Sequence, residues 1–171
     1  DDRARILAEI DAATQAAAVT AIPNEIDRLY AGLGILDVNA FTTDDATVYM
    51  AELPAARLAT WARVEAQRLA DPTFRLFYPE LEAVYEEKNI SLDTPEDRVD
   101  EALRLALFPR HPYGTQTILG AAEHLKNPAH AEMVAYHRRW YLPNNAALIL
   151  AGDLDKAATL AALELAFETW S

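Results

Sequence analysis

The amino-acid sequence predicts an α+β fold, with helices packed on a mainly antiparallel sheet. Two observations carry this prediction: helical patterns cover most of the 171 residues, and the three predicted strands do not alternate regularly with the helices. Regular alternation is typical of a parallel sheet, so its absence favours antiparallel strands. A chain of this length can bury a core of its own, and we expect a single domain over residues 1–171.

Seven helices are expected, most of them bounded by a residue that caps or breaks a helix. Asn24 is expected to cap the second helix, Gly32 and Gly34 to end it, and Pro95 to open the fifth. The first helix is rich in alanine, the best helix former, and we expect it to be buried by packing rather than to bind a partner helix. The predicted helices cover residues 3–20, 25–31, 54–69, 71–90, 95–107, 127–140 and 155–168.

Residues 35–41 and 46–53 are rich in β-branched and aromatic side chains and are separated by the polar residues 42–45. This pattern predicts a β-hairpin, or two strands joined by a short polar turn. The apolar run at residues 146–151 predicts a buried strand. Residues 109–114 are expected to form a loop.

Composition and charge exclude several classes of protein. The 27 acidic and 15 basic side chains leave a net charge of −12, which repels phosphate backbones, so no nucleic-acid partner is expected. No apolar run is long enough to span a membrane. The absence of cysteine excludes disulfides, thiolate zinc sites and cysteine nucleophiles. Both ends of the chain look like cut edges, which we interpret as a fragment or a processed piece.

The helix that contains Glu80 and Glu87 is the most informative segment for chemistry. At about 100° per residue, these two carboxylates lie within about 20° of each other and border the apolar stripe of the helix, whereas Glu82 and Glu86 fall on the opposite face. We therefore expect Glu80 and Glu87 to point towards the core. An inward carboxylate must be paired, protonated or bound to a metal, and an ion pair with a nearby arginine stays open on spacing alone.

The four histidines do not by themselves predict a metal site. His130 and His137 share a helix but stand about 10 Å apart along its axis, too far for one ion. His111 belongs to a compact loop and is expected to position the chain. The sequence contains no P-loop, no Gly-x-Gly-x-x-Gly and no Gly-x-Ser-x-Gly motif.

Several motifs, in their order along the chain, resemble the insulinase/pitrilysin family of zinc metallopeptidases. The resemblance extends over about residues 24–155, and the segment from Phe77 to Asn89 looks like a bacterial branch of the family. Each motif is short, and their common order carries the resemblance. The motifs are Gly34, Val38-Asn39-Ala40-Phe41-Thr42, Asp45-Ala46-Thr47-Val48-Tyr49, Glu80-x-x-x-Val84-x-x-Glu87, Phe108-Pro109-x-His111-Pro112-Tyr113-Gly114, Gly120, Tyr141-x-Pro143-Asn144-Asn145 and Ala151-Gly152-Asp153.

The resemblance implies a peptidase whose Zn²⁺ sits on an inverted His-x-x-Glu-His helix, with the glutamate between the histidines as general base. Glu87 matches the family's third zinc ligand, and Glu80 matches the acid that supports the ligands. Asn39, Ala40 and Phe41 match the exposed edge strand of the family, on which a peptide or protein substrate adds as a further β-strand.

One departure from the family pattern limits these expectations. The sequence contains no His-x-x-Glu-His, and residues 1–20 contain no histidine. We therefore expect a domain that is incomplete at its N-terminal side, with upstream strands and the zinc helix missing. Zn²⁺ is expected in the complete protein, and weak or no binding and no peptidase activity in this fragment.

The resemblance also implies partners and a location. A second homologous domain or subunit is the expected partner, and the exposed sheet edge allows a dimer. The periplasm or cell envelope is expected from the bacterial members. One alternative stays open, in which the chain belongs to a non-catalytic homologous domain that acts as a structural or substrate-clamping partner. The residues upstream of Asp1 discriminate between the two.

Overall fold

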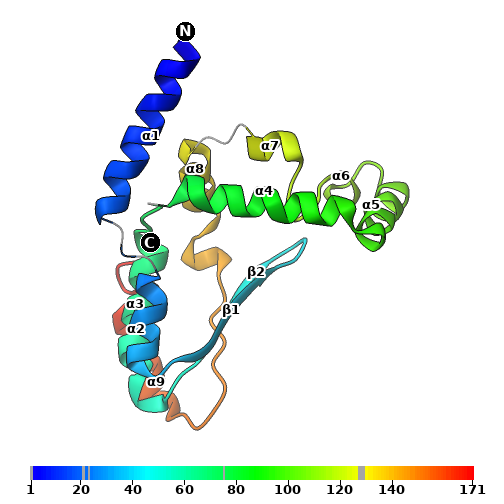
Figure 1. Cartoon of the computed structure of the whole chain (residues 1–171). Coiled ribbons are helices and arrows are strands. Elements are labelled where there is room, and N and C mark those ends of the chain that lie inside the picture. Colours follow the sequence, from blue (N-terminus) through cyan, green and yellow to red (C-terminus); the bar gives the residue numbers. More distant parts are fainter. Residues whose placement is uncertain (1, 21, 23, 75, 127–129) are drawn as a thin grey trace. The chain divides into compact units, whose positions relative to one another are not determined.

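A computed structural model describes residues 2–20, 22, 24–74, 76–126 and 130–171. Helices predominate among these residues and the sheet has two strands, which confirms the predicted α+β class (Figure 1). The short turn between the strands makes them antiparallel. The elements are α1 (Asp2–Thr20), α2 (Glu25–Leu33), β1 (Leu36–Thr42), β2 (Thr47–Glu52), the 3₁₀ helix η1 (Ala55–Arg57), α3 (Leu58–Ala70), α4 (Phe77–Asp93), α5 (Pro95–Leu107), α6 (Pro112–Thr115), α7 (Ala122–Lys126), α8 (His130–Trp140), the 3₁₀ helix η2 (Pro143–Asn145) and α9 (Lys156–Phe167).

Most predicted elements are confirmed, with shifts at their ends. The largest shift is at α4, which begins at Phe77 rather than at residue 71. Asp71 is instead the C-cap of α3, and its N–H donates to the carbonyl oxygen of Gln67 at 3.0 Å. A residue before proline avoids the helical conformation, which explains why α3 ends at Ala70. The predicted opening of α8 at Asn127 and Pro128 lies outside the described residues.

Three further predictions are wrong in detail. The expected loop at residues 109–114 contains the first residues of α6. Residues 146–151 do not form a strand, because no strand of the described chain pairs with them, and Ile149 is 87% exposed. The expected burial of the first helix is not observed, since every side chain of α1 that the structure describes is exposed. Among the described residues, no helix is both long and apolar enough to cross a bilayer.

Contacts divide the chain into two compact units, which we describe separately. The first unit contains α1, the turn end of the hairpin (Ala40–Val48) and the helices α4 to α7. The second contains α2, the remainder of the hairpin, α3, α8 and α9. The single domain that the sequence predicts, incomplete at its N-terminal side, stays a prediction.

The buried apolar core of the described chain lies in the second unit. It forms where α3 packs against α9 and receives side chains from the end of α2. Gly34 ends α2 in the left-handed conformation, with φ of 72°, so that the next residue turns back into the core. The buried apolar side chains are Tyr30, Ile35, Leu58, Ala62 and Ala66.

The hydroxyl of buried Tyr30 is satisfied from α3. Arg68 donates to it at 2.9 Å and also donates to the two carboxylate oxygens of Glu65, at 3.0 and 3.1 Å. Burial raises the pKa of the Glu65 carboxyl, although the charge of Arg68 and its hydrogen bond act in the opposite direction. The polar cluster thus connects α2 to α3 without leaving a buried donor or acceptor unpaired.

The first unit is organised around α4. Helices α5 and α7 both pack on α4, and α6 packs on α5 (Figure 1). The contact between α6 and α5 depends on Gly114, because a Cβ there would stand 2.5 Å from the carbonyl oxygen of Arg104 and would also meet that of Phe108. Only glycine fits at this close approach of two backbones.

Candidate functional site

Helix α4 carries the two glutamates that the sequence singles out, and both are exposed. The predicted inward orientation of Glu80 and Glu87 is therefore wrong for the described chain, as Glu82 and Glu86 are exposed too. The reason lies in which side of the helix is covered. At about 100° per residue, buried Lys88 lies roughly 80° to 100° around the helix from Glu80 and Glu87. The two glutamates thus flank the covered side instead of facing it.

The described residues do not by themselves form a metal site. Within them, no group of three or more histidine, aspartate and glutamate side chains could hold a metal ion. Zinc in proteins takes three or four protein ligands. Glu87 offers one exposed carboxylate, which suits a ligand but does not complete a set.

Lys88 follows Glu87 directly, and sequence reasoning missed its importance. It is a charged residue buried in the first unit, 5% exposed. Its ammonium group donates to Oε1 of Glu101 on α5 at 2.7 Å and to Oγ1 of Thr117 at 3.4 Å. A buried ammonium is tolerated only when it is paired and hydrogen-bonded, so this contact fixes the rotation of α4 against α5. The signal was present in the sequence, since Lys88 falls in the middle of the apolar stripe.

The predicted substrate strand is exposed along its whole length. Asn39, Ala40 and Phe41 lie in β1, and every residue of β1 is exposed, Phe41 to 48%. In the part of the chain that the structure describes, the sheet contains β1 and β2 alone, so β1 has a neighbouring strand on one side. The structure thus confirms the exposed strand, whereas binding of a peptide there stays a prediction.

The turn of the hairpin, residues 43–46, is held by its own hydrogen bonds. We call these four residues the hairpin tip. The N–H of Thr43 donates to the carbonyl oxygen of Ala46 at 2.7 Å. The hydroxyl oxygen of Thr43 accepts from the N–H groups of Asp45 and Ala46. Such a threonine turn fixes the backbone of the tip locally.

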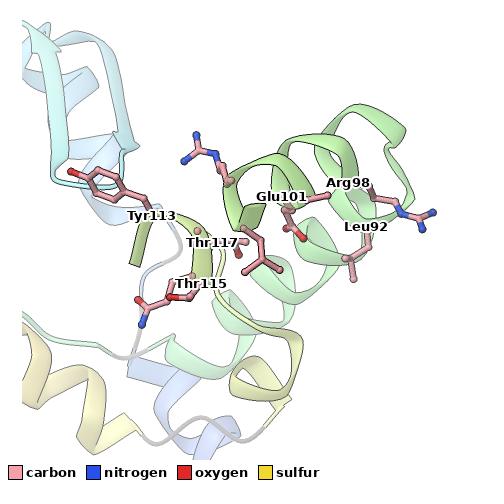
Figure 2. A pocket seen from close by; sticks show the side chains of 11 residues that line it. Leu92, Arg98, Glu101, Tyr113, Thr115 and Thr117 are labelled. Atoms are coloured by element: carbon pink, nitrogen blue, oxygen red, sulfur yellow. The ribbon is translucent and has the colours of Figure 1, made fainter. Parts of the chain in front are cut away.

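Two residues of the first unit contact the acidic side chains of the hairpin tip. Arg104 of α5 donates to Oδ2 of Asp44 at 2.9 Å. The Tyr113 hydroxyl lies 2.8 Å from each carboxylate oxygen of Asp45, to which it donates. Figure 2 shows the Tyr113 side chain directed at the pale cyan ribbon of the hairpin. The hydrogen bond to Asp45 raises the pKa of Tyr113, and the bonds to Asp44 and Asp100 raise that of Arg104.

A hollow of about 500 Å³ opens beside these contacts, between α5 and the segment that includes α6 (Figure 2). Neither Glu80 nor Glu87 lines it, so it is separate from the predicted zinc ligand. Its walls mix aliphatic, hydroxyl and charged groups. The lining residues are Leu92, Arg98, Glu101, Ala102, Arg104, Leu105, Tyr113, Gly114, Thr115, Gln116 and Thr117.

The histidines have local structural contacts. His111 precedes α6, and its Nδ1 accepts from the N–H of Tyr113 at 3.3 Å, which agrees with the positioning role predicted for it. His137 stacks on Tyr141 with ring centroids 4.5 Å apart and meets Phe74 edge-on. Burial among these rings lowers the pKa of His137. The hydroxyl of Tyr141 is in turn hydrogen-bonded to that of Tyr49 on β2, at 2.9 Å.

No family model matches the chain. Curated proteins do match it: it is 28% identical over 121 residues to uncharacterized zinc proteases of Mycobacterium tuberculosis and Mycobacterium leprae. It is 26% identical over 149 residues to the probable zinc protease PqqL of Escherichia coli. The chain is thus similar to proteins named zinc proteases. These matches cover 70% and 82% of this chain, respectively.

A solved structure agrees with the fold. The crystal structure of a protease from Helicobacter pylori superposes with a TM-score of 0.78 over 85% of this chain, at 23% identity. At that identity the likeness shows a shared fold. The chain spans 27% of the length of the mycobacterial relatives, 16% of the Escherichia coli protein and 36% of the Helicobacter chain.

Proposed function

We propose that the chain is part of a zinc-dependent metalloendopeptidase of the insulinase/pitrilysin type. The similarity to curated zinc proteases over 70% of the chain carries the proposal. The ordered motifs of the sequence support it, because several of them lie on the elements that a peptidase of this type needs: an exposed strand β1 and a helix α4 that presents Glu87.

Within this proposal, Glu87 supplies one zinc ligand and Glu80 supports it from one side. The two carboxylates stand about two turns apart on the same side of α4. The exposure of Glu87 leaves it accessible to a metal held also by residues outside the described chain. A zinc ion held there would polarise the carbonyl of a peptide bond. This chain's own contribution is to place the Glu87 carboxylate, through the rotation that Lys88 and Glu101 give to α4.

Strand β1 receives the substrate in this proposal. A peptide or protein segment adds alongside Asn39, Ala40 and Phe41 and pairs its backbone with the strand, while neighbouring side chains give selectivity. The described residues offer one zinc ligand, Glu87, and contain no group of three potential ligand side chains that could hold a metal ion. We therefore expect the 171-residue chain by itself to be inactive, and a second homologous domain or subunit to complete the enzyme. We also propose the periplasm or cell envelope as its location, which cell fractionation tests.

Zinc content and peptide hydrolysis, measured for this chain and for a longer protein extended upstream, test the proposal. We expect stoichiometric zinc and hydrolysis in the extended protein alone, with activity lost on chelation and restored by added Zn²⁺. Absence of zinc and of hydrolysis from both proteins would instead favour a non-catalytic, substrate-clamping domain. Hydrolysis that survives complete removal of the metal would contradict the zinc mechanism.

A further inference from the structure

The hairpin tip is held by donors from two separate elements. Arg104 comes from α5 and Tyr113 from α6, and they contact adjacent carboxylates, Asp44 and Asp45. The contacts connect residues 60 and 68 positions apart in the sequence. Each is a hydrogen bond to a charged group, which is stronger than a bond between neutral partners.

Both donors are themselves held in place. The Nε of Arg104 donates to Asp100 one helical turn earlier, at 2.6 Å. The ring of Tyr113 meets the rings of His111 and Phe108 edge-on, with centroids 4.4 and 5.8 Å away. Because α6 packs closely on α5 at Gly114, the two donors form one preorganised support.

A hairpin of two strands needs such a support. Isolated two-stranded hairpins are marginally stable in water, and every residue of β1 is exposed. A strand that is already ordered binds an extended peptide at a lower entropic cost than a strand that orders on binding. Contacts at the tip therefore influence binding along β1 without touching the peptide.

We propose that Tyr113 and Arg104 are positioning residues, which hold the acidic hairpin tip and so preorganise β1 for an extended peptide. The inference rests on the proposed function, in which β1 binds the substrate. It assigns these two residues a role in substrate affinity and none in the chemical step. Loss of a tip contact raises KM and leaves kcat unchanged.

The test compares variants of the full-length protein that differ by few atoms. Tyr113→Phe removes the donor, Asp45→Ala removes the acceptor, and Asp45→Asn keeps an acceptor oxygen. Tyr136→Phe is the matched control, since Tyr136 is an exposed tyrosine of α8. Four quantities are measured: KM and kcat with a randomised ten-residue fluorogenic peptide library, Kd for the same peptides with a fluorescein label, and hydrogen exchange of the amides of residues 43–48.

We expect Tyr113→Phe and Asp45→Ala each to raise KM and Kd about three- to tenfold, with kcat unchanged and faster exchange in the tip. Asp45→Asn should restore most of the affinity, and the double variant Tyr113→Phe/Asp45→Ala should be no worse than either single one. The control should behave like the wild type. A structural role alone would lower kcat and thermal stability together.

Failure of the inference and failure of the proposed function give different results. Unchanged KM, Kd and tip exchange in Tyr113→Phe, with hydrolysis intact, would overturn the inference and leave the function standing. If the wild type binds peptides without hydrolysing them, the peptidase proposal fails. In that case, a higher Kd in Tyr113→Phe than in the wild type still supports the inference. If the wild type binds no peptide, the inference is overturned as well.

Discussion

The ammonium nitrogen of Lys88 lies 2.7 Å from Oε1 of Glu101, and the Lys88 side chain is 6% exposed. This pair connects α4 to α5 from the residue next to the predicted zinc ligand, Glu87. The two partners are not equally buried, because the side chain of Glu101 is 37% exposed. We therefore expect the loss of Lys88 and the loss of Glu101 to lower the free energy of unfolding by different amounts.

We expect Glu101→Gln to destabilise the protein by about 1–3 kcal/mol, because it leaves a buried ammonium with a weaker, neutral partner. Lys88→Met should cost less, since it removes the buried charge together with the need to pair it. Urea unfolding measures both, with Glu86→Gln on the exposed side of α4 as the control. Equal losses for the two variants would show that desolvation of Lys88 does not dominate.

The sequence predicted the longer helices, apart from the start of α4, because their signals are local, and it did not predict the short helices α6 and α7. Caps, prolines and apolar spacing act within a few residues, and α5 and α9 appear within one or two residues of their expected ends. Burial depends instead on which elements meet, and the pattern did not contain that information. Residues 146–151 are apolar enough for a strand, but a strand exists only with a partner, and none pairs with them in the described chain.

The candidate site likewise has features that follow from local sequence and features that depend on contacts between distant elements. The shared side of Glu80 and Glu87 follows from helix geometry, whereas their exposure depends on α5 and α7 covering a different side of α4. The contacts of the hairpin tip with Arg104 and Tyr113 span 60 residues or more, so no local pattern could predict them. The one local hint was that the hairpin tip contains two adjacent acidic residues, Asp44 and Asp45, and no other charged residue.

Gly114→Ala is expected to destabilise the protein by roughly 1–3 kcal/mol, because the new Cβ would clash with backbone oxygens that cannot move without separating α6 from α5. Gly32→Ala is the matched control. Nothing lies within 4 Å of a Cβ there, and Gly32 is inside α2, so the change should stabilise the protein by about 0.4–1 kcal/mol. Thermal unfolding measures both, and a neutral Gly114→Ala would contradict the close packing of α6 on α5.

Glu87→Gln in the full-length protein is expected to abolish zinc-dependent hydrolysis while leaving the fold intact, because a neutral amide is a much poorer zinc ligand than a carboxylate. Glu82→Gln, on the far side of α4, should be nearly silent. Zinc content, peptide hydrolysis and circular dichroism together separate loss of the ligand from unfolding. Retained metal and activity in Glu87→Gln would rule out the ligand role, and a loss in Glu82→Gln equal to that in Glu87→Gln would rule out the helical placement.

We expect protonation of His137 to make the protein less stable in mild acid. Burial against Phe74 and Tyr141 lowers its folded-state pKa below the ordinary 6.5, whereas the unfolded chain keeps that value. Between the two pKa values the unfolded state binds more protons, so this contribution to stability is complete above about pH 6.5 and declines as the pH falls through the window below it. His137→Phe keeps an aromatic ring and cannot be protonated.

The fall in Tm between about pH 7.5 and about pH 5.5 should therefore be smaller in His137→Phe than in the wild type. Other groups also titrate in this range, and the difference between the two proteins isolates His137. His124→Gln is the control, because it replaces an exposed histidine on the short helix α7. Equal slopes in the wild type and His137→Phe would show that the ring is protonated in the folded protein as easily as in the unfolded chain, and that the aromatic contacts do not desolvate it.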